Sequence, residues 1–152
     1  METRIHNGVT YAIEVEQDLD TPAPWMEDDG HGIVTDWTSR DKRPGELVLN
    51  TDRNSKRFYD LKGSIEIARR DSWGSENCTP DMTPKQRAAQ AVKDDYEFLK
   101  GWCDGEWCYN VISVTPVDQF GEHLGEYTEY LGGVPGTGTC VEEAIEEILK
   151  RF

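Results

Sequence analysis

The sequence lacks long apolar stretches. No segment approaches the roughly 18 consecutive apolar residues of a membrane-spanning helix, and the polar start Met1-Glu2-Thr3-Arg4 lacks the apolar core of a signal peptide. We therefore predict no membrane association and a cytoplasmic protein.

Basic residues are also scarce. Only 16 Lys and Arg stand against 30 Asp and Glu, which gives a formal net charge of −14. A field of this sign repels nucleic acid and attracts basic surfaces, most strongly at low salt. We expect no direct nucleic-acid binding.

Metal-ligating residues are few and poorly spaced. The three histidines, His6, His31 and His123, are scattered, and Cys103 and Cys108 form a lone C-x4-C, whereas structural zinc needs paired knuckles or nearby histidines. Nothing marks the chain as secreted, so the four cysteines are predicted to be free thiols. We predict no metal and no cofactor.

A glycine-rich segment, Gly132–Gly138, precedes the last predicted helix, but it lacks the lysine of a phosphate-binding loop. That helix opens with Glu142 and Glu143, which would repel phosphate. We interpret the segment as a loop without a nucleotide.

The strongest structural signal runs from Thr83 to Pro116. Thr83, Pro84 and Gln86 have the spacing of a capped helix start, and an apolar stripe follows at helical period. Beyond the turn near Gly105, apolar residues occupy both alternations of Glu106–Thr115, which predicts a central strand.

Weaker patterns predict the remaining elements. They are strands at Val9–Val15, Ile33–Trp37, Glu46–Asn50 and Gly125–Leu131, with a hairpin joining the second and third, and helices at 61–70 and, with a Thr139/Glu142 capping box, at 139–152. For 61–70, Gly63 and the alternation of Ile65 and Ile67 leave a strand open as the alternative. This order does not alternate as a parallel α/β fold would. We predict a single α+β domain over residues 1–152, with a mainly antiparallel sheet of about four or five strands covered by about three helices.

One acid, Asp95, falls inside the apolar stripe of the long helix. A carboxylate there needs a partner. It could be held by a structural hydrogen bond or by an arginine from the basic middle of the chain, namely Arg57, Arg69 or Arg70. Alternatively, it could be a general acid close to Glu106 or His123.

The segment Trp25–Gly32 contains three acids, two glycines and one histidine. Glu27, Asp28, Asp29 and His31 could bind a hard cation or form an acid/base cluster. The simpler interpretation, which we favour, is an exposed acidic loop.

Charge is distributed unevenly along the chain. Residues 1–39 carry a net charge of −8, residues 40–70 carry +4 and residues 71–152 carry −10. The basic middle is either a phosphate or partner site or, as we favour, a set of Arg and Lys side chains that form intramolecular ion pairs with the acidic thirds. The last helix presents Glu142, Glu143, Glu146 and Glu147 on its polar face.

Three segments, Ser55–Gly74, Leu99–Tyr109 and Asp29–Gly32, resemble small uncharacterised proteins encoded by tailed bacteriophages. The resemblance implies a phage-type accessory protein in the host cytoplasm and brings no active site with it.

The first functional hypothesis is therefore a non-enzymatic interaction protein, an inhibitor or nucleic-acid mimic, that docks on a basic host protein. The residues expected to bind are Asp28, Asp29, Glu142, Glu143, Glu146 and Glu147. One alternative is a small hydrolase or metal-dependent enzyme that uses Asp28, Asp29, His31 and Asp95. Another is a structural or assembly component.

Overall fold

The computed structural model describes residues 2–125 and 127–152, so Met1 and Glu126, which fall in segments considered above, lie outside the described residues. The described elements form two compact units: unit 1 comprises residues 1–21 and 107–152, and unit 2 comprises residues 22–106. All strand pairs are antiparallel, which confirms the α+β class. The strands belong to two sheets rather than to one. The single domain stays a prediction.

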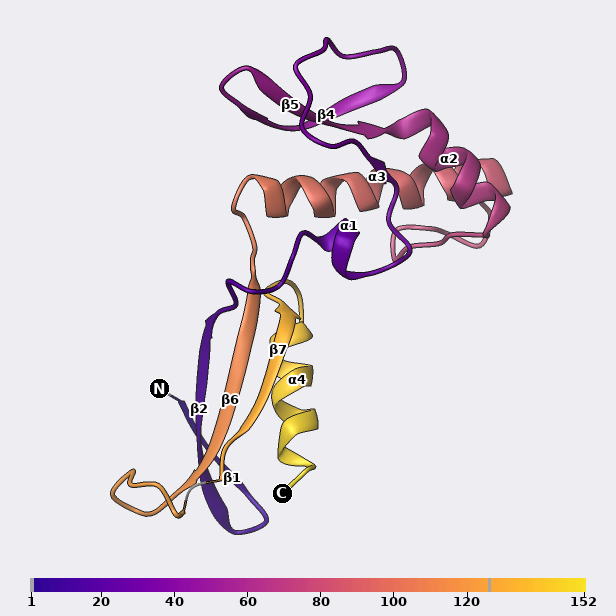
Figure 1. Cartoon of the computed structure of the whole chain (residues 1–152). Coiled ribbons are helices and arrows are strands. Elements are labelled where there is room, and N and C mark those ends of the chain that lie inside the picture. The colour runs from indigo at the N-terminus through magenta and orange to yellow at the C-terminus, as the bar shows by residue number, and fades with distance from the viewer. Residues whose placement is uncertain (1, 126) are drawn as a thin grey trace. The chain divides into compact units, whose positions relative to one another are not determined.

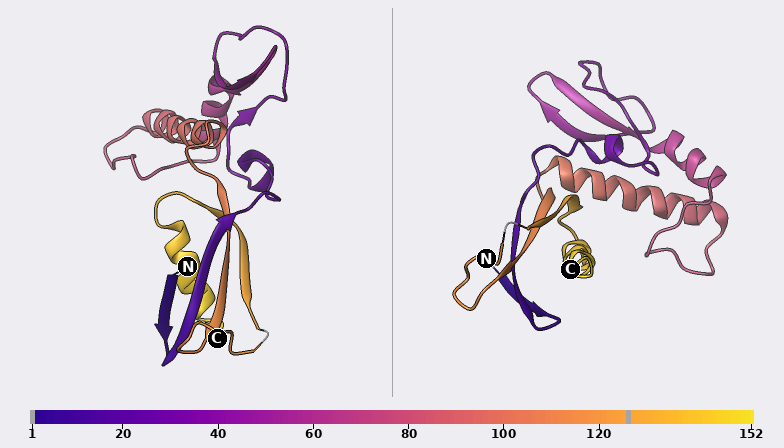
Figure 2. Two further views of the ribbon diagram at one scale, coloured as in Figure 1. Left: turned by 90° about the vertical axis from the view of Figure 1, so that its left-hand side faces the viewer. Right: turned by 60° about the horizontal axis from the view of Figure 1, so that its bottom comes forward.

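Unit 1 is a four-stranded sheet with one helix packed on it (Figure 1). Its strands are β1 (Glu2–His6), β2 (Val9–Gln17), β6 (Tyr109–Val117) and β7 (Glu129–Pro135), in the order β1-β2-β6-β7. Helix α4 (Cys140–Leu149) covers one face (Figure 2) and buries Ile145 and Ile148 against the sheet. The predicted central position of β6 is confirmed.

The hairpin of β1 and β2 was not predicted, although the sequence carries its signal. Asn7 and Gly8 both have positive φ, 51° and 82°, and His6 pairs with Val9 across this two-residue turn. An Asn-Gly pair favours this turn because both residues tolerate the left-handed region. β1 is an edge strand rich in polar residues, so it shows little apolar alternation.

Strand β7 begins four residues later than predicted and includes Gly132, Gly133 and Val134, which were interpreted as a loop. The pairing register with β6 shifts here, and Gly133 has a φ of 64°. The Asp18 carboxylate accepts the backbone N–H of Gly133 at 2.8 Å. The glycines therefore serve an irregular strand, in which Val134 is buried.

The start of α4 also differs from the prediction. Thr139 makes no side-chain cap to the helix backbone, so the capping box with Glu142 is absent. The Thr139 hydroxyl instead donates to the carboxylate of Glu143, and Glu142 bonds Arg4 of β1. The predicted buried stripe is confirmed by Ala144, Ile145, Ile148 and Leu149.

Unit 2 contains a three-stranded sheet and three helices. Its strands are β3 (Ile33–Val34), β5 (Ser55–Asp60) and β4 (Glu46–Asp52), in the order β3-β5-β4. The predicted hairpin between Ile33–Trp37 and Glu46–Asn50 is therefore wrong, because β5 lies between them. β5 was missed since its apolar residues, Phe58 and Tyr59, are adjacent and do not alternate.

The helices of unit 2 are α1 (Pro24–Glu27), α2 (Leu61–Arg70) and α3 (Pro84–Cys103). Helix α2 matches its predicted range, and α3 lies between the predicted start at Thr83 and the turn near Gly105. At the start of α3, Thr83 and Gln86 form the predicted capping box. Residues of α2, α3 and the sheet share one core, which contains Leu49, Tyr59, Ala68, Ala88, Val92 and Leu99.

None of the helices within residues 2–125 and 127–152 combines the length and the apolar character needed to cross a membrane. All four cysteines are free, as predicted.

Candidate functional site

Asp95 is the centre of a hydrogen-bonded cluster in unit 2. Its Oδ1 lies 2.6 Å from Nδ1 of His31, and its Oδ2 accepts the backbone N–H of Gly32 and the hydroxyl of Tyr59, each at 2.8 Å. The Asp95 side chain is 10% exposed. The predicted need for a partner is confirmed, and its structural hydrogen-bond alternative holds.

The arginine alternative for Asp95 is wrong, and Glu106 is not among its described partners. The described carboxylate contacts lead to His31, Gly32 and Tyr59 only. No pattern in the sequence predicts these three partners, because they lie 36 to 64 positions from Asp95 along the chain.

The backbone at Gly32 makes the cluster possible. A Cβ at this position would lie 2.2 Å from the Tyr59 hydroxyl and 2.5 Å from Oγ of Ser64. Only glycine allows the loop to approach so closely. Ser64, which is fully buried, accepts the N–H of Ile33 at 2.9 Å and holds the next residue of the loop.

The environment keeps the Tyr59 hydroxyl protonated. Burial, together with the negative charge of Asp95, raises the pKa of Tyr59 well above its ordinary value. The hydroxyl therefore remains a hydrogen-bond donor to the carboxylate at all ordinary pH values.

His31 is held on two sides. Its ring stacks on Phe98, with centroids 5.9 Å apart and planes 7° from parallel. In the tautomer that donates from Nδ1 to the Asp95 carboxylate, Nε2 is the ring nitrogen that can accept from a ligand. A cavity of about 380 Å³ lies beside the cluster, lined by residues that include Gly30, Asp94, Asp95 and Phe98.

The two acids of the preceding loop do not join this cluster. Asp28 and Asp29 are exposed. Among the described residues, no group of three or more His, Cys, Asp or Glu side chains is placed to hold a metal ion. Of the four residues in the acid/base alternative, only His31 and Asp95 therefore lie in the described cluster.

The basic middle of the chain forms one strong internal ion pair. Arg40 bonds both carboxylate oxygens of Glu46, at 2.8 and 2.7 Å, and this contact lowers the pKa of Glu46 to about 2. Arg57 instead lies between two tryptophan rings, 5.2 Å from the centroid of Trp25 and 4.5 Å from that of Trp37.

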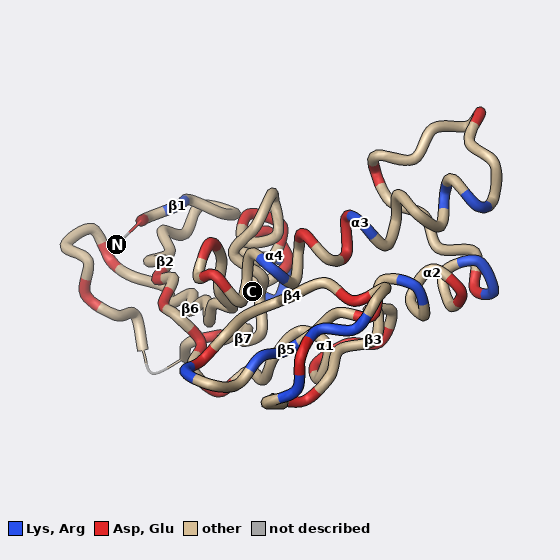
Figure 3. Tube along the Cα trace, turned by 90° about the horizontal axis from the view of Figure 1, so that it is seen from above, with Lys and Arg blue, Asp and Glu red and all other residues tan. Residues whose placement is uncertain are grey.

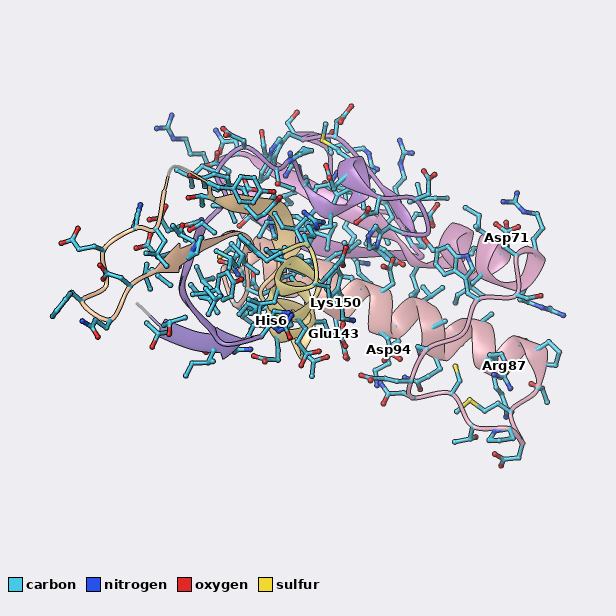
Figure 4. All side chains as sticks on the ribbon, turned by 90° about the horizontal axis from the view of Figure 1, so that it is seen from below. His6, Asp71, Arg87, Asp94, Glu143 and Lys150 are labelled. Atoms are coloured by element: carbon cyan, nitrogen blue, oxygen red, sulfur yellow. The ribbon has the colours of Figure 1, made fainter. Side chains whose placement is uncertain are left out.

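The glutamates of α4 differ in their surroundings. Glu142 accepts a bond of 2.7 Å from Arg4, which lowers the pKa of Glu142. Glu147 lies 3.4 Å from Arg151. Glu143 is bonded only by a neutral hydroxyl, and Glu146 has no ion-pair partner among the described residues. Figure 4 shows Glu143 on this helix.

Charge also differs between the two units. Unit 1 contains thirteen acids and three bases, a net charge of −10, whereas unit 2 contains seventeen acids and thirteen bases, a net charge of −4. The separation is visible along the trace in Figure 3. The division could not be seen in the sequence because unit 1 combines both ends of the chain.

Unit 1 carries two further exposed acids that the sequence interpretation did not single out. Tyr11 and Ile13 of β2 face α4, so the alternating residues Glu14 and Glu16 face the opposite side of the sheet, and both are exposed. Their period-2 spacing was the available signal.

Comparison with protein-family models, with curated proteins and with solved structures finds no match.

Proposed function

We propose that the protein acts without catalysis and binds a basic protein surface through the acidic unit 1. The observation that carries this proposal is the net charge of −10 in unit 1. Two of the three bases in this unit, Arg4 and Arg151, already contact glutamates. The resemblance to phage accessory proteins points to a basic protein of the host as the partner.

The polar face of α4 supports binding as a nucleic-acid mimic. Apart from Glu142, which Arg4 holds, the face presents Glu143, Glu146 and Glu147, which span about 6 Å of helix axis at the usual rise. Of these, Glu147 also lies 3.4 Å from Arg151. The mean interval is about 3 Å per charge, against roughly 1.7 Å in duplex DNA, so this face is a sparser row of charges of the same sign. The row extends over one to two turns only, so this face fits a few Lys or Arg side chains.

The face of the sheet opposite α4 offers a second contact. Glu14 pairs with Ser113, and Ser113 pairs with Tyr130, which is 65% exposed. At the usual strand spacing, the acid and the aromatic ring lie about 10 Å apart. The carboxylate and the tyrosine ring together suit a cationic side chain, because a tyrosine ring attracts cations and anchors interfaces.

Asp28 and Asp29 remain part of the proposal as a separate contact, since they belong to unit 2. They have no described counterpart in the acidic face of α4.

The test compares two variants with the same change in net charge. One carries Glu143→Gln, Glu146→Gln and Glu147→Gln in unit 1, and its matched control carries Glu66→Gln, Glu76→Gln and Glu97→Gln at exposed sites of unit 2. A labelled peptide of alternating Lys and Arg serves as the probe, and fluorescence anisotropy gives its affinity at about 50 and 500 mM salt.

We expect the unit 1 variant to bind about tenfold more weakly or worse, because three exposed ion pairs each contribute up to about 1 kcal/mol. The control should change the affinity by less than about twofold. Equal effects of the two variants, or affinity insensitive to salt, would sink the proposal, because screening must weaken such contacts. Capture from host lysate at both salt concentrations, followed by competition with duplex DNA, then identifies the partner and tests mimicry.

A second candidate function, acid/base catalysis, is favoured by the 2.6 Å contact between His31 and Asp95. An imidazole whose Nδ1 is held by a carboxylate presents a defined Nε2, as in hydrolases that use such pairs. The test measures hydrolysis of activated carboxylate and phosphate esters. A rate that falls about 100-fold in His31→Gln but not in Asp28→Asn supports catalysis; no activity, or equal rates, removes it.

A further inference from the structure

A pocket of about 310 Å³ lies between α2, the start of α3 and the loop that joins them, all within unit 2. Its size is at the lower end of the range of small-molecule sites. The residues that define it are Ala68, Arg69, Trp73, Met82, Pro84 and Arg87. It thus combines an apolar wall with two cationic groups.

Neither guanidinium in this pocket is neutralised within the described residues. Arg87 donates to a neutral acceptor, the carbonyl of Thr79, at 3.2 Å, and the described ion pairs do not include Arg69 or Arg87. Their neighbour Arg70 does bond a carboxylate, that of Asp71. The chain has 30 acids and 16 bases, so a pocket in which two arginines lack an acidic partner is unexpected.

The backbone turns so that an aromatic ring closes the pocket. Helix α2 ends in a Schellman-type turn, in which the N–H of Trp73 donates to the carbonyl of Ala68 at 2.9 Å and Ser72 has a φ of 55°. This bond returns Trp73 over the end of the helix.

The opposite wall adds favourable electrostatics. Pro84 is the first residue of α3, so the pocket lies at the N-terminal end of a 20-residue helix, where the helix dipole favours anions. Figure 4 shows Arg87 near this end of α3, and Asp71 at the end of α2.

We propose that this pocket binds a small organic anion, with a carboxylate or phosphate between Arg69 and Arg87 and an apolar, preferably aromatic, body against Trp73 and Met82. Guanidinium groups recognise both oxyanions through charge-assisted hydrogen bonds. The inference is independent of the proposed function, because it concerns unit 2 and a ligand of the opposite charge from that expected at unit 1.

The experiment titrates ¹⁵N-labelled full-length protein at about 50 mM salt with phenyl phosphate, benzoate, phenol and inorganic phosphate. The signals followed are the backbone amide of Trp73 and the side-chain Nε–H groups of Arg69 and Arg87. The variants are Arg69→Gln and Arg87→Gln. The matched control is Arg70→Gln on the same helix, where the arginine bonds Asp71.

We expect phenyl phosphate or benzoate to bind with a dissociation constant of about 1 mM or tighter. Phenol and inorganic phosphate should each bind at least about fivefold more weakly, because each lacks one half of the recognised group. Arg69→Gln should weaken binding about tenfold, as loss of a charge-assisted bond does, and Arg70→Gln by less than twofold. Whichever of benzoate and phenyl phosphate binds more tightly identifies the oxyanion.

The proposal is overturned if phenol binds as tightly as both anions, or if Arg70→Gln weakens binding as much as Arg69→Gln. It is also overturned if no followed signal shifts at about 10 mM of either anion. Arg69→Gln should not affect folding, because the Arg69 guanidinium makes no described hydrogen bond. Arg87→Gln is the less clear test, because Arg87 also bonds the carbonyl of Thr79 in the loop.

Discussion

Substitution of Asp95 tests the cluster at the centre of unit 2. The carboxylate accepts bonds from His31, Gly32 and Tyr59. Asp95→Ala removes all three and leaves the N–H of Gly32 and the hydroxyl of Tyr59 without an acceptor. Asp95→Asn keeps one oxygen, which can still accept from Gly32 and Tyr59, while the amide nitrogen faces His31.

The two substitutions should therefore differ in cost. An unsatisfied buried donor costs about 1 to 3 kcal/mol, so Asp95→Ala should lower the free energy of unfolding by about 4 kcal/mol. In Asp95→Asn, a change of tautomer lets Nδ1 of His31 accept from the new amide, so mainly the charge assistance is lost, about 2 kcal/mol. Both are large fractions of a typical domain stability of about 5 to 15 kcal/mol.

The assay is urea unfolding followed by tryptophan fluorescence. Trp25, Trp37, Trp73 and Trp102 belong to unit 2 and only Trp107 to unit 1, so the signal reports mainly unit 2. Far-UV circular dichroism gives the second probe, which is needed because the two units need not unfold together. The control is Glu97→Gln at an exposed position of the same helix, expected to stay within about 0.5 kcal/mol of wild type.

A double-mutant cycle with Tyr59→Phe sharpens the prediction. Tyr59→Phe should cost about 1 kcal/mol in the wild type and nothing in the Asp95→Ala background, where the hydroxyl is already without an acceptor. The reasoning is refuted if Asp95→Ala is no more harmful than Glu97→Gln, or if the effects of Asp95→Ala and Tyr59→Phe simply add.

Three further predictions concern single positions. Ser72→Gly should raise the free energy of unfolding by about 1 kcal/mol, because Ser72 adopts a left-handed φ, and Ser72→Ala, measured by the same urea unfolding, should not. Thr83→Ala should lower it by about 1 kcal/mol through loss of the helix cap, whereas equal stability would contradict the capping box. The low pKa of Glu46, about 2, contributes stability above its ordinary value of 4.5, which is lost as pH falls toward 2. The urea midpoint of the wild type should thus approach that of Glu46→Gln between pH 5 and pH 2; a constant difference would contradict the ion pair.

Elements with strong local signals were predictable. The capping residues and the helical stripe of α3 identify it without tertiary information, and the apolar residues on both faces of β6 indicate its central position. Local chemistry also showed that Asp95 needs a partner. It did not show which one, because the partners come from a loop and a strand that only the folded chain brings to α3.

Pairing between distant strands was less predictable. Ile33–Val34 and Glu46–Asp52 each pair with β5, and neither pairs with the other, although a turn between them made a hairpin plausible. The Thr139/Glu142 spacing also predicted a contact that does not form, because Arg4, near the other end of the chain, bonds Glu142. In both cases a long-range contact replaced the predicted local one.

The order of the strands in unit 1 has a consequence for folding. β2 and β6 are neighbours, with Gln17 opposite Asn110, yet the whole of unit 2 lies between them in the chain. Closing so long a loop costs about 3 kcal/mol more than closing a four-residue turn if the intervening chain is unfolded. A unit 2 that is already folded shortens the effective loop, so we expect the sheet of unit 1 to form last, as the slow step. A destabilising change in unit 2 would then slow the assembly of strands that it does not touch.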